Sequence, residues 1–173
     1  MEMWGIIIVV LAVVALSTRL FRREPAPAPT GLLVEHFPNP TDLHTADLSF
    51  KPDFAYLWFY RTEVTNTLDE PLQILRFEAF FWVENRWVAS NVLGRPLTDE
   101  VFTRWYGIED GPNNGWLRPG VKAVCEVNWH GMPSPTCPRM KWVFYAQDER
   151  GNPYQGEGEV ISVPYDETAA LAP

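Results

Sequence analysis

The sequence is poor in cysteine and in basic residues. Its 2 Cys among 173 residues are too few for a disulfide-rich small domain or for a zinc site built from four thiolates. Lys and Arg number 14 against 22 Asp and Glu, which gives a formal net charge of −8. Proteins that bind nucleic acid need a basic surface to neutralise phosphates. The charge therefore argues against nucleic acid as a partner.

Motifs of the common active sites are also missing. The chain has no dinucleotide-binding G-x-G-x-x-G, no phosphate-binding G-x-x-x-x-G-K-[ST], no H-E-x-x-H and no G-x-S-x-G. Asp42 and His44 would share one face of a strand, where they could hold a metal or a proton, but a surface turn capped by the aspartate is the favoured interpretation. We therefore predict a non-enzymatic protein without a cofactor or a metal ion.

The two cysteines lie on either side of a loop with the sequence HGMPSPTCP. His130 and Cys137 could bind a soft metal, but two further ligands are not evident nearby. Cys125 alternates with Val and Ala, which indicates a core cysteine. A disulfide between Cys125 and Cys137 stays open as an alternative if the domain lies outside the cell.

An apolar run opens the chain, from Met3 to Leu16. Extended to Phe21, a helix starting at Met1 would reach ~30 Å, just enough to cross a bilayer. A cleaved signal peptide is the alternative, because Ala15 and Ser17 are small residues before a potential cut. Its start would normally be basic, whereas this one holds Glu2. We therefore predict an uncleaved single-pass anchor, with these interfacial residues: Trp4, Arg19, Arg22 and Arg23.

The arginines after the apolar run set the predicted orientation. Basic residues favour the cytoplasmic side of a membrane. We therefore expect the N-terminus outside and the following domain in the cytoplasm, at the inner membrane if the cell is bacterial. The predicted units are the anchor 1–23, a Pro-rich linker 24–30 (EPAPAPT), a β domain 31–163 and a tail 164–173.

Alternating apolar and polar residues predict that the domain is mainly β. The strongest patterns fall within 54–65, 75–83, 121–129, 140–147 and 157–163, and weaker ones within 32–37, 46–50 and 86–90. In the third pattern, Cys125, Val127 and Trp129 share one face. Glu63, Glu78 and Glu126 are expected on solvated outer faces. The turns Glu84–Arg86 and Asp148–Gly151 suit hairpins, and such strands together predict an antiparallel sandwich.

One short helix interrupts the strand pattern. Thr98 can cap it, Asp99 and Glu100 complement its positive end, and Gly107 is placed to end it. We expect this helix to bridge strands and to close one end of the sandwich.

Three turn motifs of the domain resemble those of immunoglobulin-like domains. They are V-x-N at Val64–Asn66, the Pro-Gly turn at Pro119 and Gly120, and D-x-x-G-N from Asp148 to Asn152. The resemblance covers about residues 60–160 and implies an immunoglobulin-like antiparallel β-sandwich, with one short helix inserted. The helix and the absence of a Cys–Trp–Cys arrangement depart from antibody domains. The resemblance implies an architecture and no function.

Aromatic residues on both faces of a predicted strand indicate that both faces are covered. Phe80 and Trp82 lie opposite Phe77 and Phe81, and the cover could be the helix, the loop 107–116 or another subunit. The candidate interface residues are Phe80, Trp82, Trp105, Tyr106 and Trp116.

Two functions follow from these features. The first is a non-enzymatic accessory or scaffold subunit that binds integral membrane subunits of a larger complex. Its layout is similar to that of the H subunit of purple-bacterial reaction centres, without a shared motif, so photosynthetic and respiratory assemblies are the first contexts to consider. The second is a membrane-tethered module that binds a carbohydrate or a peptide through Trp105, Tyr106 and Trp116.

Overall fold

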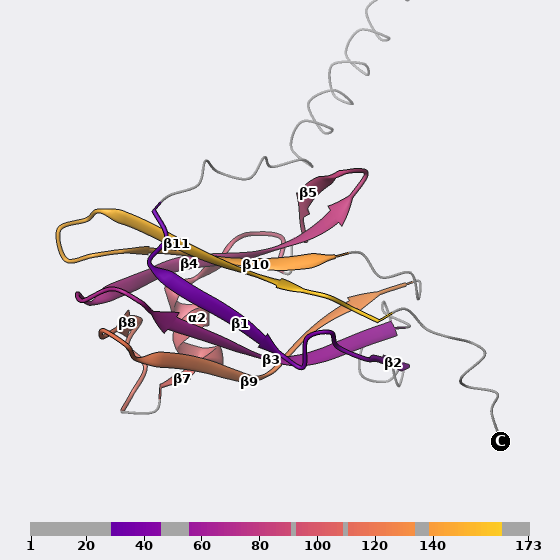
Figure 1. The fold of residues 1–173 in the computed structure, drawn as a ribbon, viewed down its shortest axis with the longest axis horizontal. Coiled ribbons are helices and arrows are strands. Elements are labelled where there is room, and N and C mark those ends of the chain that lie inside the picture. Colours follow the sequence, from indigo (N-terminus) through magenta and orange to yellow (C-terminus); the bar gives the residue numbers. More distant parts are fainter. Residues whose placement is uncertain (1–28, 46–55, 91–92, 109–110, 134–138, 164–173) are drawn as a thin grey trace, which may run out of the picture.

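The computed structural model describes residues 29–45, 56–90, 93–108, 111–133 and 139–163 (Figure 1). The predicted anchor with Trp4, Arg19, Arg22 and Arg23, the strand expected at 46–50, Cys137 and the tail lie outside these residues. Within the described part of the chain, no helix is long and apolar enough to cross a membrane.

The described residues form two antiparallel sheets, which confirms the prediction of a mainly β, sandwich-like domain. Sheet I has the order β1 (Leu32–Phe37), β3 (Tyr56–Asn66), β9 (Lys122–Met132), β7 (Gly107–Ile108), and β2 (Leu43–Thr45) also pairs with β3. Sheet II has the order β11 (Pro153–Val160), β10 (Met140–Gln147), β4 (Leu72–Val83), β5 (Arg86–Ala89), and β6 (Leu97–Thr98) and β8 (Trp116–Leu117) also pair with β4.

The core lies between the inner faces of the two sheets. Tyr60 and Val64 from β3 meet Phe77 from β4 and Trp142 and Phe144 from β10. The rings of Phe77 and Phe144 are stacked, with centroids 5.2 Å apart. Burial of large apolar side chains at about 25 cal/mol per Å² is the main stabilising contribution in such a core.

One side of the sandwich is closed where β1 passes next to β11. Gly156 and Gly158 of β11 make this close approach feasible. A Cβ at Gly156 would lie 2.3 Å from the carbonyl oxygen of Leu32, and one at Gly158 would lie 2.6 Å from that of Val34. The two glycines are therefore needed for packing rather than for an unusual backbone conformation.

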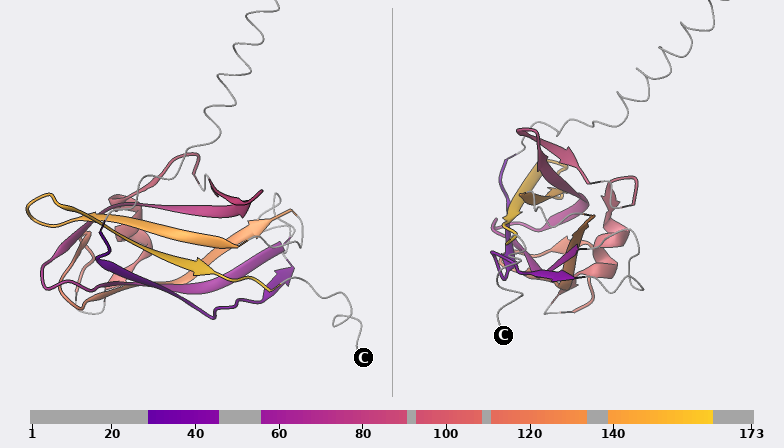
Figure 2. Two further views of the ribbon diagram at one scale, coloured as in Figure 1. Left: turned by 45° about the horizontal axis from the view of Figure 1, so that its top comes forward. Right: turned by 90° about the vertical axis from the view of Figure 1, so that its right-hand side faces the viewer.

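The opposite side is closed by helix α2 (Asp99–Trp105), which connects β6 of sheet II to β7 of sheet I. Figure 2 (right) shows α2 on one flank and β1 with β11 on the other. Thr98 occupies the N-cap position, but its side chain makes no capping hydrogen bond. The expected glycine cap is also wrong, because Tyr106 ends the helix in an extended conformation and Gly107 already belongs to β7.

The two predicted hairpin turns are confirmed. Glu84 and Asn85 both have positive φ, 49° and 62°, which is the geometry of a two-residue hairpin loop between β4 and β5. In the other turn, Gly151 has φ 82° and donates its N–H to the carbonyl of Asp148.

An irregularity in sheet I changes the faces of β9. The register between β3 and β9 shifts between Tyr60 and Thr62. Tyr60 pairs with Asn128, whereas Thr62 pairs with Cys125, so β9 has one extra residue between these pairs. Glu126 and Val127 are both exposed at this bulge, and Val127 keeps 69% of its surface accessible. The prediction that Cys125, Val127 and Trp129 share one face is therefore wrong, because one extra residue reverses the alternation.

Candidate functional site

A cavity of about 270 Å³ lies between the sheets beside α2, and we call it the inner cavity. Aromatic and apolar side chains form most of its wall. Its lining residues are Phe81, Ser90, Leu93, Trp105, Asn128, Trp129, His130, Gly131, Met140 and Trp142. Four of these residues belong to β9 of sheet I, and three others belong to β4 and β10 of sheet II. The inner cavity is therefore formed jointly by both sheets and the helix.

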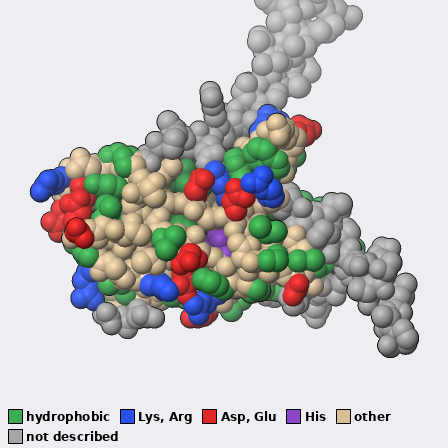
Figure 3. Space-filling view, in the orientation of Figure 1, with side chains coloured by type: hydrophobic (Ala, Val, Ile, Leu, Met, Phe, Trp, Pro, Cys, Tyr) green, Lys and Arg blue, Asp and Glu red, His purple; other side chains and the backbone are tan. Residues whose placement is uncertain are grey.

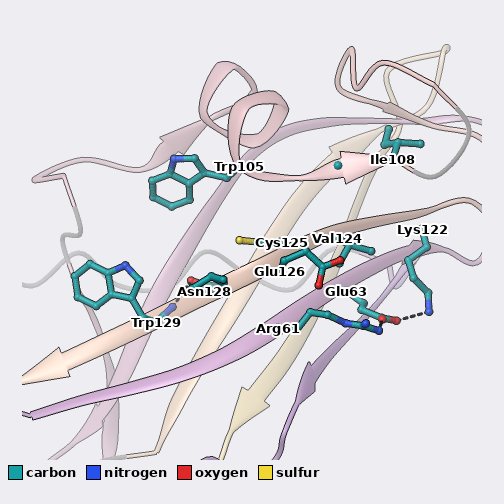
Figure 4. Close-up of a pocket in the computed structure, with 12 residues that line it drawn as sticks. Arg61, Glu63, Trp105, Ile108, Lys122, Val124, Cys125, Glu126, Asn128 and Trp129 are labelled. Carbon is teal, nitrogen blue, oxygen red and sulfur yellow. Dashed lines mark hydrogen bonds and ion pairs between the residues drawn. The ribbon is translucent and has the colours of Figure 1, made fainter. Parts of the chain in front are cut away.

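A larger, open cleft of about 790 Å³ adjoins the inner cavity, and we call it the outer cleft (Figure 4). It is lined by β7, by β9 from Lys122 to Trp129, and by Arg61 and Glu63 of β3. The strand β7 pairs with β9 at Ala123 and Val124, and the outer cleft opens where this short pairing ends. The inner cavity and the outer cleft share Trp105, Asn128 and Trp129, and therefore meet at these side chains.

Trp105 and Trp129 come from different elements to this junction. Trp105 is the last residue of α2, and its ring contacts Phe77 edge-on at 5.9 Å between centroids. Trp129 is turned outward by the bulge and pairs in register with Phe59. Both tryptophans are half-buried, and Figure 4 shows their rings on the same side of the outer cleft. Such rings offer a large apolar surface together with an N–H donor.

Two polar side chains of the inner cavity, Asn128 and His130, form hydrogen bonds with other parts of the protein. Asn128 donates through Nδ2 to Thr62 Oγ1 at 2.9 Å and accepts the backbone N–H of Trp129 at 2.9 Å. Thr62 Oγ1 also lies 3.0 Å from Nδ1 of His36. His130 Nε2 lies 3.1 Å from Ser162 Oγ. The bonds among Asn128, Thr62 and His36 connect β9, β3 and β1.

Both buried histidines are neutral at physiological pH. Burial, with a smaller contribution from the nearby His36, lowers the pKa of His130 to about 3. Burial likewise lowers the pKa of His36 to about 4, although its bond to the carbonyl of Gly158 opposes the shift. The ring of His130 is stacked on that of Trp58 with centroids 5.1 Å apart. A neutral, stacked imidazole adds a polar ring to the lining without adding a charge.

Ser90 brings a buried hydroxyl to the inner cavity. Its backbone N–H donates to the carbonyl of Ala79 at 2.8 Å, which continues the β4–β5 ladder and fixes its position. Among the described residues, its Oγ has no hydrogen-bond partner. A buried hydroxyl without a partner is uncommon in folded proteins and requires an explanation.

Two glutamates that were expected on solvated faces are buried. Glu63 is 2% exposed because Arg61 and Lys122, on either side of it, form ion pairs with its carboxylate (Figure 4). Glu78 is 6% exposed and binds Arg76 at 2.8 Å. Both glutamates are buried for the same reason, because long basic side chains on the same face of the sheet cover their carboxylates. Glu126 is exposed as predicted.

The predicted interface residues do not form one surface. Tyr106 is only 2% exposed, and its ring is stacked on Phe102 with centroids 4.6 Å apart. Phe80 is 1% exposed on the outer face of sheet II, in register with Ala89 and Lys141. These two predictions are corrected, because both rings are covered. The helix does not cover Phe80, since its aromatic residues contact Phe77 on the opposite face.

The other predicted positions are placed as follows. Trp82 packs edge-on against Trp87 at 5.1 Å between centroids, beneath the guanidinium of Arg139. Trp116 is half-buried on β8, and it lines neither the inner cavity nor the outer cleft. Of the five candidates, the structure brings only Trp105 to the site. Trp129, Asn128 and Ser90 were missed, because the bulge and the hydrogen-bond network have no clear signal in the sequence.

The residues considered for metal or redox chemistry do not form a centre in the described part of the chain. No group of three His, Cys, Asp or Glu that could hold a metal is present there. Asp42 is exposed, while the side chain of His44 lies outside the described residues. Cys125 carries a free thiol, and burial raises its pKa, so it has the character of an unreactive core cysteine.

Comparison with known proteins assigns no family to the chain. No protein family matches the sequence, and no curated protein matches it. A crystal structure from Bordetella pertussis with the provisional name ApaA has 16% identity and a TM-score of 0.43, covering 79% of this chain and 98% of the other. An X-ray structure of a structural-genomics target has 10% identity and a TM-score of 0.46, covering 80% and 95%. At these values neither likeness assigns a function.

Proposed function

We propose that this protein is a non-enzymatic binding module whose ligand enters between Trp105 and Trp129. The observation that carries the proposal is the meeting of the inner cavity and the outer cleft at these two tryptophans. Ligand sites in proteins are typically concave, largely apolar, and furnished with a few polar groups that orient the ligand. The inner cavity has this composition, with Ser90, Asn128 and His130 as its polar groups.

The outer cleft also supports the proposed binding function, although its lining contains charged side chains. The carboxylate of Glu63 lies between Arg61 and Lys122, so this part of the lining is charged but internally paired. On the face shown in Figure 3, acidic and basic side chains also lie in mixed groups. A ligand that reaches from the inner cavity into the outer cleft would therefore pass from apolar to polar surroundings. A peptide with an aromatic side chain and a carbohydrate are the two classes to compare.

Fluorine NMR of the full chain in detergent, labelled with fluorotryptophan, tests the proposal. The Trp105→Phe and Trp129→Phe variants assign the two resonances of the site. The probes are monosaccharides, short extended peptides with a central aromatic residue, and small neutral aromatic compounds. We expect at least one probe class to shift both resonances in a saturable manner.

Trp116 is the matched control, because it is also half-buried but lines neither space. Its resonance, assigned with Trp116→Phe, should stay unshifted by a probe that moves the other two. Uniform shifts of Trp105, Trp129 and Trp116, or no saturable shift by any class, would contradict the proposed function.

The membrane context remains a proposal based on the sequence. The apolar run from Met3 to Leu16 supports a single-pass anchor that holds the domain at the membrane as an accessory subunit. Exposed apolar side chains on the outer face of sheet I support a protein partner there: Leu33 and Phe37 on β1 are 47% and 45% exposed. Retention of the chain in the membrane pellet after alkaline carbonate extraction is the expected result. Release into the supernatant would contradict the anchor.

We further propose that the two sheets form an immunoglobulin-like sandwich. The buried side chain of Asn66 within V-x-N and the Asp148 turn support an immunoglobulin-like sandwich. An experimental structure that gives the strand connections of residues 46–55 would test it.

A further inference from the structure

We infer that the inner cavity selects an uncharged, ring-sized group carrying a hydrogen-bond acceptor, and that Ser90 Oγ donates to this acceptor. The inference rests on the proposed binding function and specifies the chemistry of the ligand. Three observations carry it: the unsatisfied hydroxyl, the absence of charge in the lining, and the aromatic walls.

The hydroxyl of Ser90 is the first of these. It is fixed by the backbone bond to Ala79, it lines the inner cavity, and it has no partner among the described residues. A buried polar group without a partner costs about 1–3 kcal/mol, which is regained when a ligand supplies the missing bond. The neighbouring Asn128 already uses its amide and its carbonyl in the network. Ser90 is therefore the lining group with most to gain from a ligand.

The charge of the lining is the second observation. Among the described residues that line the inner cavity, none is Asp, Glu, Lys or Arg. His130 is buried and stacked on Trp58, so it stays neutral. A charged group that leaves water must find an opposite charge or several hydrogen bonds. The inner cavity offers neither to a carboxylate or an ammonium, so it discriminates against both.

The walls are the third observation. Phe81, Trp105, Trp129 and Trp142 place four aromatic rings around a volume of about 270 Å³. Flat aromatic walls favour a flat apolar partner. A monosaccharide has many hydroxyl groups and would find too few partners in Ser90, Asn128 and His130. The shape and the polarity thus favour a planar ring with one acceptor.

Calorimetric titration of the full chain in detergent with four probes tests the inference. Acetophenone is a neutral ring with an acceptor, ethylbenzene lacks the acceptor, and benzoate and benzylamine carry opposite charges. We expect acetophenone to bind about tenfold more tightly than ethylbenzene, as one hydrogen bond to a buried donor predicts. It should also bind at least about tenfold more tightly than benzoate and benzylamine, because each of these must bring a charge out of water. Ser90→Ala should weaken acetophenone about tenfold and leave ethylbenzene unchanged.

Thr103→Ala is the control variant, because it removes a hydroxyl of α2 that is bonded to the carbonyl of Glu100 and does not line the inner cavity. It should leave all four affinities unchanged. Benzoate or benzylamine binding as tightly as acetophenone, or an equal effect of Ser90→Ala on acetophenone and ethylbenzene, would overturn the inference while leaving the binding function intact. If none of the four probes binds and none shifts the Trp105 and Trp129 resonances, the inference is overturned; failure of every other probe class as well would overturn the proposed function.

Discussion

The indole Nε1 of Trp142 donates a hydrogen bond to the hydroxyl of Tyr60 at 2.8 Å, and this bond joins the two sheets through the centre of the core. Trp142 lies on β10 of sheet II and Tyr60 on β3 of sheet I. The Tyr60 hydroxyl also lies 3.6 Å from the sulfur of Met140, which lines the inner cavity. Because Met140 and Trp142 both belong to β10 and line the inner cavity, the bond ties this wall of the candidate site to sheet I.

Tyr60→Phe should lower the free energy of unfolding by about 1–3 kcal/mol, because it leaves the Trp142 N–H buried without an acceptor. Urea unfolding measures the change. Tyr154→Phe is the control, since its hydroxyl makes a longer, 3.3 Å bond to Glu70 in a more accessible position. Equal losses in the two variants would contradict a special contribution of the Tyr60–Trp142 bond.

Gly158→Ala should destabilise the domain by about 1–3 kcal/mol, because the added methyl group overpacks the contact between β1 and β11. The Cβ would lie 2.6 Å from the Val34 carbonyl oxygen and 2.9 Å from Nε2 of His36. Gly107→Ala should be nearly neutral, since its nearest neighbour is 3.9 Å away. Thermal unfolding of both variants checks the prediction, and a neutral Gly158→Ala would mean that β1 does not pass so close.

Asn66→Ala should lower the free energy of unfolding by about 2–4 kcal/mol, because it leaves three buried or partly buried backbone groups without their hydrogen-bond partner. Asn66 donates to the carbonyls of Glu70 and Leu117 and accepts the N–H of Leu68. Asn114→Ala removes one exposed bond, to the N–H of Trp116, and should cost much less. Chemical unfolding distinguishes the two, and a similar loss for both would refute the anchoring role of Asn66.

Stability should fall as the pH is lowered from 7 to 5. The folded pKa values of His36 and His130, about 4 and about 3, lie below the ordinary value of 6.5. Between these limits the unfolded chain binds protons that the folded chain does not, so each histidine removes about 1.4 kcal/mol per pH unit once its unfolded form is protonated. The His36→Asn/His130→Asn double variant should show a flatter dependence in urea unfolding.

The imidazole resonances of His36 and His130 in the folded wild-type chain provide a second readout that does not require a variant to fold. They should not titrate between pH 7 and pH 5. Titration of either ring near pH 6.5 would show that it is accessible to water and would contradict the buried network.

Regular strands could be predicted from alternation alone, whereas the site could not. Burial alternates along β1, whereas Met140–Phe144 of β10 are all buried, and the structure reproduces the predicted strands at 32–37 and 140–147. The same alternation gave a wrong prediction for β9, because one extra residue at the bulge turned Trp129 outward and made it part of the site. Glu63 was placed on the correct strand face, but its burial depends on Lys122, which is distant in sequence.

Ser90 shows most clearly what could not be predicted from the sequence. Its position at the end of the predicted strand at 86–90 was foreseeable, but a hydroxyl without a partner is visible only when the surrounding strands are in place. The helix aromatic residues were foreseen as a group, yet the sequence did not show which would remain accessible. Trp105 reaches the site, whereas Tyr106 turns into the core.

The most direct test of the central claim is a crystal structure of the full chain soaked with para-bromophenol, a neutral ring whose bromine is located by anomalous scattering. The account predicts a bromine peak within the inner cavity, among Phe81, Trp105, Trp142 and Ser90. A cavity filled by the protein's own side chains, or a peak confined to other surfaces, would contradict it.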